Sequence, residues 1–175
     1  MAASSLIWQI SDPTTRRYVI IRHAEKTGLP GDRDLSSEGL ARAQALQSLP
    51  ETLGTIDAII AARSVAKSAR PVETVEPLAA ILGLPIDIRW NTHDIDDLVS
   101  TVSGDSWLDG KQILICWRHD ALQALAQALG AQDASPWPSA LYDRIWLLTV
   151  SRGSVHLGAL RQILTKNIIR LVPEP

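Results

Sequence analysis

The sequence predicts an α/β fold, with a mostly parallel central sheet flanked by helices in a three-layer sandwich. Apolar segments of strand length alternate along the chain with amphipathic segments of helix length. The strand segments are almost continuously apolar, which is typical of strands covered on both faces. The chain has 175 residues, of which 46% are apolar, so it can bury a sizeable core, and we expect one domain over 1–175.

The strands are expected where short apolar runs are followed by polar or turn residues. In chain order they are 18–22, 57–62, 86–90, 112–117 and 144–150, with 154–161 a weaker candidate. Between them, two helices each present one apolar stripe at helical spacing: Val75, Leu78, Ala79 and Leu82, then Leu122, Leu125, Ala126 and Leu129. Gly83 and Gly130 stand where these two helices should end. A third helix, capped by Ser36 or Ser37, should run to about Leu49.

Large side chains are expected to fill the core. Six tryptophans and no phenylalanine indicate that tryptophan takes the place of phenylalanine there. Trp90, Trp137 and Trp146 are assigned to the core, whereas Trp107 and Trp117 have the wall of an apolar pocket as an alternative. The single cysteine, Cys116, lies in an apolar strand and is expected to be a buried core residue.

The charge balance excludes several classes of partner. Seventeen basic and nineteen acidic residues give a formal charge of −2 and a pI near 6.1. Such a chain has no overall field for nucleic acid or for an anionic membrane surface, so neither is expected as a partner. Residues 1–10 contain neither a basic region nor an apolar stretch of the length that a signal peptide or membrane span needs. A cytoplasmic protein is therefore expected.

Two Arg-His pairs in the sequence indicate a functional site. Arg22-His23 ends the first apolar run, and Arg118-His119 ends the run 113–117. Ligands of open α/β sheets bind beyond the carboxyl ends of the strands, so His23, His119 and Arg63 are expected on one edge of the sheet. Two histidines at matched positions, each preceded by arginine, predict one anion-binding catalytic site.

Four blocks of sequence make the chain recognisable: Ile-Ile-Arg22-His23-Ala24-Glu25-Lys26, Leu35-Ser36-Ser37-Glu38-Gly39, Arg70-Pro-Val-Glu73-Thr74 and Cys116-Trp-Arg-His119. In that order they resemble the histidine phosphatase superfamily, the phosphoglycerate mutase-like proteins, over about residues 18–150. The chain is most similar to a small branch with an Arg-His-Ala-Glu start. Ala24 departs from the pattern, because glycine is commonest there. The resemblance implies a phosphohistidine mechanism that uses neither a metal nor another cofactor.

The resemblance also implies a role for four residues. His23 would be the nucleophile, attacking phosphorus as neutral imidazole. Arg22 and Arg70 would bind the phosphoryl oxygens, because a guanidinium fork matches phosphate geometry and stays charged. His119 would complete the phosphate pocket from the start of the following helix.

The acid that protonates the leaving group has two candidates. Asp120 directly follows His119, and a His-Asp pair at this point resembles the phytase branch of the family. Asp94 lies about where mutase-like members carry their acid. Each also has a structural interpretation, since Asp120 can cap a helix and Asp94 can begin one. His93 beside these acids raises the alternative of a metal-binding site. No second histidine lies nearby at ligand spacing, so no metal is expected.

A phosphomonoester hydrolase acting on a small phosphorylated substrate is the expected function. The stretch between Arg70 and His119 is too short for the large cap domain of phytase-like members. A mutase would need further basic residues for a second phosphate-bearing group, and only Lys26, Arg63 and Arg118 are obvious. The alternative is a noncatalytic or biosynthetic anion-binding member of the fold. The sequence does not indicate an oligomeric state, and residues 162–175 could pack on the domain or on a second subunit.

Overall fold

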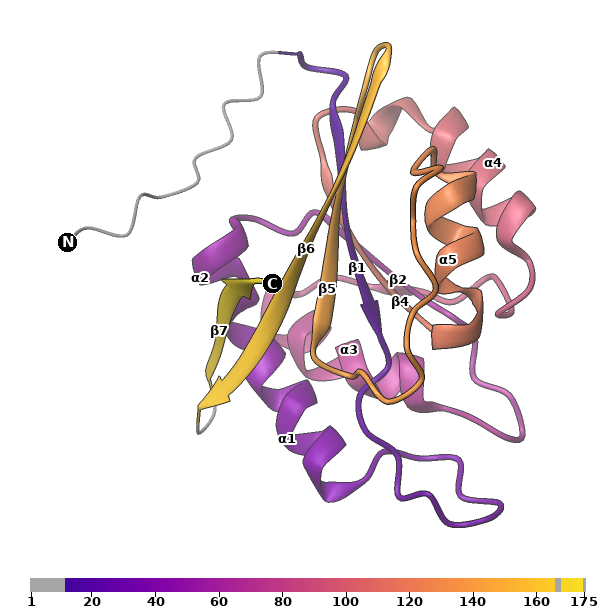
Figure 1. The fold of residues 1–175 in the computed structure, drawn as a ribbon, viewed down its shortest axis with the longest axis vertical. Helices are drawn as coiled ribbons and strands as arrows, with labels where there is room; N and C mark the ends of the chain where they lie inside the picture. The colour runs from indigo at the N-terminus through magenta and orange to yellow at the C-terminus, as the bar shows by residue number, and fades with distance from the viewer. Residues whose placement is uncertain (1–11, 166–167, 175) are drawn as a thin grey trace, which may run out of the picture.

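The computed structural model describes residues 12–165 and 168–174. It has the predicted α/β fold, in which helices cover both faces of one mixed sheet with the strand order β3-β2-β4-β1-β5-β6-β7 (Figure 1). The strands are β1 (Arg16–Arg22), β2 (Ala58–Ala61), β3 (Ile86–Asp87), β4 (Gln112–Trp117), β5 (Arg144–Ser151), β6 (Ser154–Thr165) and β7 (Ile168–Pro173). The α-helices are α1 (Ser37–Ala45), α2 (Leu49–Leu53), α3 (Arg70–Leu82), α4 (Ile95–Gly104) and α5 (His119–Ala128), with 3-10 turns η1 (Leu46–Ser48) and η2 (Ser106–Leu108).

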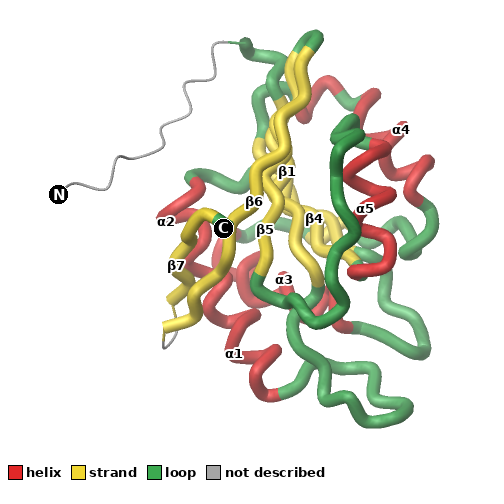
Figure 2. Tube along the Cα trace, viewed as in Figure 1, coloured by secondary structure: helices red, strands yellow, loops and turns green. Residues whose placement is uncertain are grey.

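The sheet separates two apolar cores. Helices α1, α2 and α3 pack on one face, and α4 and α5 on the other (Figures 1 and 2). Successive side chains of a strand point to opposite faces, so Val19 and Ile21 of β1 enter the first core while Tyr18 and Ile20 enter the second. Burial on both faces is why the central strands are apolar at every position.

The sheet is parallel on one side of β1 and antiparallel on the other. Strands β1, β2, β3 and β4 pair in parallel, whereas β5, β6 and β7 each pair antiparallel with the strand before them in the sheet order. In the β1–β4 pair, Arg22 lies opposite Trp117, the last residue of β4. The carboxyl ends of the two central strands are therefore level with each other.

Two expected elements are divided or shortened. The helix expected from Ser36 to Leu49 is capped as predicted, because the Ser36 hydroxyl accepts the Gly39 N–H. It passes into the 3-10 turn η1 and restarts as α2, where Pro50 is an early residue that has no N–H to continue an α-helical ladder. Strand β3 stops after Asp87, whose carboxylate accepts the Arg89 N–H at 3.2 Å and turns the backbone out of the ladder.

The described part of 162–175 packs on its own domain. Strand β6 continues to Thr165, and β7 folds back against it. Ile169 of β7 enters the core beneath α1 and η1, and its N–H donates to the Ser48 hydroxyl at 3.0 Å. This contact occupies an outward-facing amide of the edge strand, a group that would otherwise be available for pairing with another chain.

The three tryptophans assigned to the core are buried, and the two that had a pocket wall as an alternative divide between core and surface. Trp90, Trp117, Trp137 and Trp146 are buried, whereas Trp107 is 59% exposed. Cys116 is buried in β4, and burial raises the pKa of its thiol, which keeps the sulfur protonated. Among the described helices, none has both the length and the apolar character needed to cross a bilayer.

Gly39 should be required for packing rather than for backbone freedom. A Cβ at this position of α1 would lie 2.3 Å from the carbonyl oxygen of Glu25. We expect Gly39→Ala to lower the free energy of unfolding in urea by about 1–3 kcal/mol, because backbone cannot move aside as a side chain can.

Gly104→Ala is the matched control, since a Cβ there meets no atom within 4 Å at the end of α4. This control should be neutral or stabilising by up to about 1 kcal/mol. An equal loss of stability in both variants would contradict the role of the Gly39–Glu25 contact.

Candidate active site

The two Arg-His pairs meet at the carboxyl ends of the central strands. His23 follows β1 directly, and its N–H donates to the carbonyl oxygen of Trp117 at 3.0 Å, which extends the pairing by one residue. His119 is the first residue of α5, and only Arg118 separates it from the end of β4. The parallel register therefore brings together two histidines that are distant in the sequence.

Helix α3 adds a third basic residue. Arg70 is its first residue, and the Thr74 hydroxyl one turn later donates to the Arg70 carbonyl at 2.7 Å. The same hydroxyl accepts the Ala24 N–H at 2.8 Å, so the start of α3 is tied to the residue that follows His23. A guanidinium N–H of Arg70 donates to the Asp32 carbonyl at 2.9 Å, which holds the side chain across the loop after β1.

The His23 ring has a defined tautomer. Its Nδ1 lies 2.7 Å from the Ala24 carbonyl oxygen. A carbonyl only accepts hydrogen bonds, so Nδ1 carries the proton and Nε2 keeps a lone pair. Burial lowers the pKa of His23 to about 3, and the nearby positive charges of Arg22, Arg70 and His119 act in the same direction, against the hydrogen bond to Ala24. His23 is therefore a neutral, buried base at mildly acidic and neutral pH.

The loop between α5 and β5 forms part of the site. The Arg22 guanidinium donates from Nη1 to the carbonyl oxygens of Ser139 and Leu141. It also lies over the Tyr142 ring, with 3.7 Å between the guanidinium carbon and the ring centroid. The centroids of the Tyr142 and His23 rings are 6.1 Å apart. This loop fixes the direction of Arg22 and places an aromatic wall beside His23.

Sequence reasoning missed Tyr142. A signal existed in its position, two residues before the predicted strand 144–150. Because β5 pairs antiparallel with β1 and Ile145 lies opposite Ile21, the residues just before β5 must lie at the carboxyl end of β1. That inference needs the strand pairing, which the sequence pattern does not supply.

Three buried nitrogens in this cluster have no hydrogen-bond partner among the described residues: Nε of Arg22, Nε of Arg70 and Nδ1 of His119. Burial, and then the positive charge of Arg22, lowers the pKa of His119, while Asp120 raises it. Positive charges from Arg118 and Lys26 also act on His119. Unpaired buried polar groups are costly. A dense group of cationic side chains with unused nitrogens is suited to a multiply charged anion.

The two candidate acids occupy different surroundings. Asp120 follows His119 on α5 and pairs with Arg118, with 2.7 Å between the nearest nitrogen and oxygen. Asp94 immediately precedes α4, as its helix-start interpretation predicted, and its carboxylate accepts the Asn91 N–H at 2.8 Å. Asp94 makes no hydrogen bond or ion pair with Arg22, His23, Arg70 or His119, all of which the structure describes.

Other charged residues near the motifs have structural partners. Glu25 forms a bidentate pair with Arg42 of α1, with 2.6 Å between Nη2 and Oε1, and so holds the loop after His23. Arg63 follows β2 at the same edge of the sheet, is exposed, and donates to the Asn91 side chain at 3.3 Å. Within residues 12–165 and 168–174, no group of three or more His, Cys, Asp or Glu side chains is arranged to hold a metal.

Solved structures provide the comparison with known proteins, because no family model and no curated protein matches the sequence. A protein assigned as phosphohistidine phosphatase SixA from Agrobacterium tumefaciens superposes with a TM-score of 0.58 at 18% identity, covering 84% of this chain and 97% of that one. The protein histidine phosphatase SixA complexed with tungstate gives 0.60 at 14% identity, covering 81% and 93%. A phosphoglycerate mutase from Bacillus anthracis gives 0.56 at 11% identity, covering 83% and 92%. At these identities the likeness shows a shared fold.

The buried neutral His23 should make folding stability depend on pH. In the unfolded chain a histidine binds a proton below about pH 6.5, whereas folded His23 does so only near pH 3. Its contribution is therefore complete above pH 6.5 and is lost as the pH falls toward 3. Between pH 7 and pH 4.5, the free energy of unfolding in urea should fall by ~2 kcal/mol more in the wild type than in His23→Asn.

The matched control is His93→Asn, because His93 is exposed on the loop before α4. This control should retain the wild-type fall in stability. An equal fall in the wild type and in His23→Asn would show that His23 is not held neutral by burial.

Proposed function

We propose that this chain, which has the fold of the histidine phosphatase superfamily, is a metal-independent phosphomonoester hydrolase that works through a phosphohistidine on His23. One observation carries the proposal. The buried His23 ring donates from Nδ1 to the Ala24 carbonyl, which leaves Nε2 unprotonated beside the cationic groups of Arg22, Arg70 and His119. A neutral nucleophile beside fixed positive charge is what attack on a phosphoryl group needs.

The reaction takes two steps that reuse the same groups. In the first, Nε2 of His23 forms a bond to phosphorus, the ester P–O bond breaks, and the leaving oxygen receives a proton from an acid. In the second, water attacks the phosphorus, the N–P bond breaks, and the water proton passes to the same group acting as base. The Ala24 carbonyl stabilises the positive charge that develops on the ring while phosphorus is attached, because it accepts from Nδ1–H.

Arg22, Arg70 and His119 bind the phosphoryl oxygens in this scheme. Two carbonyls and the Tyr142 ring hold Arg22, and the Asp32 carbonyl holds Arg70, so neither guanidinium has to be ordered when substrate arrives. Preorganised donors of this kind stabilise the charge that builds up on the oxygens without rearranging during the reaction. Tyr142 would limit the space beside the phosphoryl group.

Asp120 is the better-supported acid and base of the two candidates. It adjoins His119, and its charge acts on the His119 ring. The partner of its carboxylate is Arg118, an exposed side chain that can exchange partners at little cost. The Asp94 carboxylate is instead engaged by the backbone at the start of α4. Asp94 stays the alternative, because a loop carrying it could shift when substrate binds.

The substrate is a small phosphorylated molecule or a phosphorylated group that protrudes from a larger one. Residues 70–119, all described, form only α3, β3, α4, η2 and β4, with no inserted domain to cover the site. The neighbours include a phosphohistidine phosphatase, so phosphorylated histidine is one group of this kind to test. A second anion-binding centre for a mutase reaction would have to rest on Lys26, Arg63 and Arg118, which supports hydrolysis over transfer.

The first test is hydrolysis of p-nitrophenyl phosphate in EDTA between pH 5 and pH 7.5. We expect turnover in the wild type and its loss by several orders of magnitude in His23→Ala, since the nucleophile is removed. A brief reaction quenched in denaturant should leave base-stable, acid-labile phosphate on the wild type only.

The control is His156→Ala. His156 of β6 lies opposite Thr149 of β5, and Thr149 lies opposite Arg17 near the start of β1, at the end of the strand away from His23. It should keep wild-type turnover. A wild type that binds inorganic phosphate but neither turns over nor becomes labelled would instead establish the noncatalytic anion-binding alternative.

The acid can be assigned from leaving-group dependence. Replacing the true acid by asparagine should lower the rate by about 10²–10⁴ for an alkyl phosphate and much less for p-nitrophenyl phosphate, because nitrophenolate leaves without a proton. We expect this pattern in Asp120→Asn and not in Asp94→Asn. The reverse pattern would transfer the role to Asp94, and equal losses for both esters would exclude proton donation by the residue replaced.

A further inference from the structure

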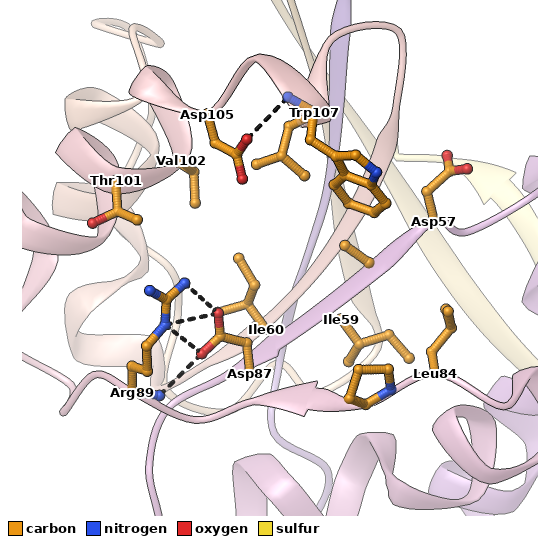
Figure 3. A pocket seen from close by; sticks show the side chains of 13 residues that line it. Asp57, Ile59, Ile60, Leu84, Asp87, Arg89, Thr101, Val102, Asp105 and Trp107 are labelled. Carbon is orange, nitrogen blue, oxygen red and sulfur yellow. Dashed lines mark hydrogen bonds and ion pairs between the residues drawn. The ribbon is translucent and has the colours of Figure 1, made fainter.

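A cavity lies at the β3 edge of the sheet, and none of the residues around His23 lines it. Its volume is about 370 Å³, and it is lined by the first half of β2, the chain on either side of β3, the end of α4 and the turn η2 (Figure 3). The volume is near the lower end of the ~300–1,000 Å³ typical of sites for small ligands.

The cavity exists because β3 is short. Strand β3 pairs only with Ile59 and Ile60 of β2, so Asp57 and Ala58 have no partner strand on that side among the described residues. The end of helix α4 and the turn η2 line the same cavity from the other side, through Thr101, Val102, Trp107 and Leu108. The interior surface is apolar, formed by Ile59, Ile60, Leu84, Pro85, Val102 and Leu108.

One wall is an exposed aromatic side chain. Trp107 is 59% exposed, unlike the other described tryptophans, which are buried. Its backbone is fixed, because the Asp105 carboxylate accepts the Trp107 N–H at 2.9 Å (Figure 3). An indole beside an apolar cavity offers a large apolar contact area, as aromatic anchors do in binding sites.

The mouth of the cavity carries an excess of negative charge. The lining includes three carboxylates, from Asp57, Asp87 and Asp105, and one cation, Arg89. Arg89 is already bound by Asp87, with 2.7 Å between Nη2 and Oδ2. Asp57 has Lys111 at 3.7 Å and accepts the Gln112 N–H. Asp105 makes no ion pair among the described residues, and its carboxylate faces the cavity from the end of α4 (Figure 3).

We propose that this cavity binds a small molecule in which one aromatic or branched apolar group is joined to a single protonated amine. The apolar group would lie between Trp107 and the Leu84 side of the cavity. The ammonium group would lie at the mouth beside the Asp105 carboxylate, which makes no ion pair among the described residues. An anionic ligand would meet repulsion from Asp105, because Arg89 is already paired with Asp87, and Lys111 with Asp57.

Two probes of matched shape test the charge preference. Phenethylamine and 3-phenylpropionate place an ammonium or a carboxylate on a similar phenylalkyl body. Each is titrated into the full chain while the indole N–H resonance of Trp107, assigned with Trp107→Phe, is followed by NMR. We expect saturable shifts with phenethylamine and on the order of tenfold weaker binding of the acid. Binding of the acid as tight as that of the amine, or no saturable shift with the amine, overturns the proposal.

Three variants locate the interaction. Asp105→Asn keeps an acceptor for the Trp107 N–H but removes the charge, so the preference for the amine should fall toward equality. Thr101→Phe fills the cavity from α4 and should abolish binding. The matched control is Glu51→Gln, an exposed carboxylate on α2 that does not line the cavity, and it should bind as the wild type does. Equal affinity in the Asp105 and Glu51 variants would exclude Asp105 as the source of selectivity.

Discussion

The parallel pairing of β1 with β4 is the constraint on which the candidate active site depends. It sets Arg22 opposite Trp117, extends to the His23 N–H, and so places the two Arg-His pairs level with each other. Side chains buried on both faces hold this register, and a shift by one residue would reverse which core each of them enters. Thr74 then ties α3 to the same end of β1. The positions of His23, Arg70 and His119 are thus consequences of how the sheet packs.

Gathering cations at one edge has an energetic cost that the rest of the site reduces. The positive charges around His23 repel one another and are partly buried, which lowers the pKa of both Arg22 and His119. Backbone carbonyls and the face of Tyr142 offset part of this cost for Arg22, as the Asp32 carbonyl does for Arg70. A bound phosphoryl group would remove most of the remaining repulsion. Such a site is less stable empty than occupied, which is the usual compromise between stability and function.

Most of the fold, and the residues now gathered at the site, could be predicted from the sequence. Continuous apolar runs identified the central strands, and the Arg-His pairs after two of them identified His23 and His119 as neighbours. The shortened β3 and the 3-10 turn before Pro50 depend on single side-chain and backbone hydrogen bonds, which no periodicity records. Tyr142 was missed for a different reason, because its place beside His23 follows from antiparallel pairing of β5 with β1.

Although the chain is close to neutral overall, it has two local regions of opposite charge. The formal charge of −2 excludes an overall attraction for polyanions, yet cations gather at the carboxyl ends of β1 and β4 while carboxylates surround the cavity beside β3. Screening in physiological salt has a length of about 8 Å, so a ligand responds mainly to the charges in its immediate surroundings. Under the two proposals, an anion would be drawn to one edge of the sheet and a cation to the cavity, without either field cancelling the other. Net charge bounds the partners of this protein, but local arrangement determines which ligand each site prefers.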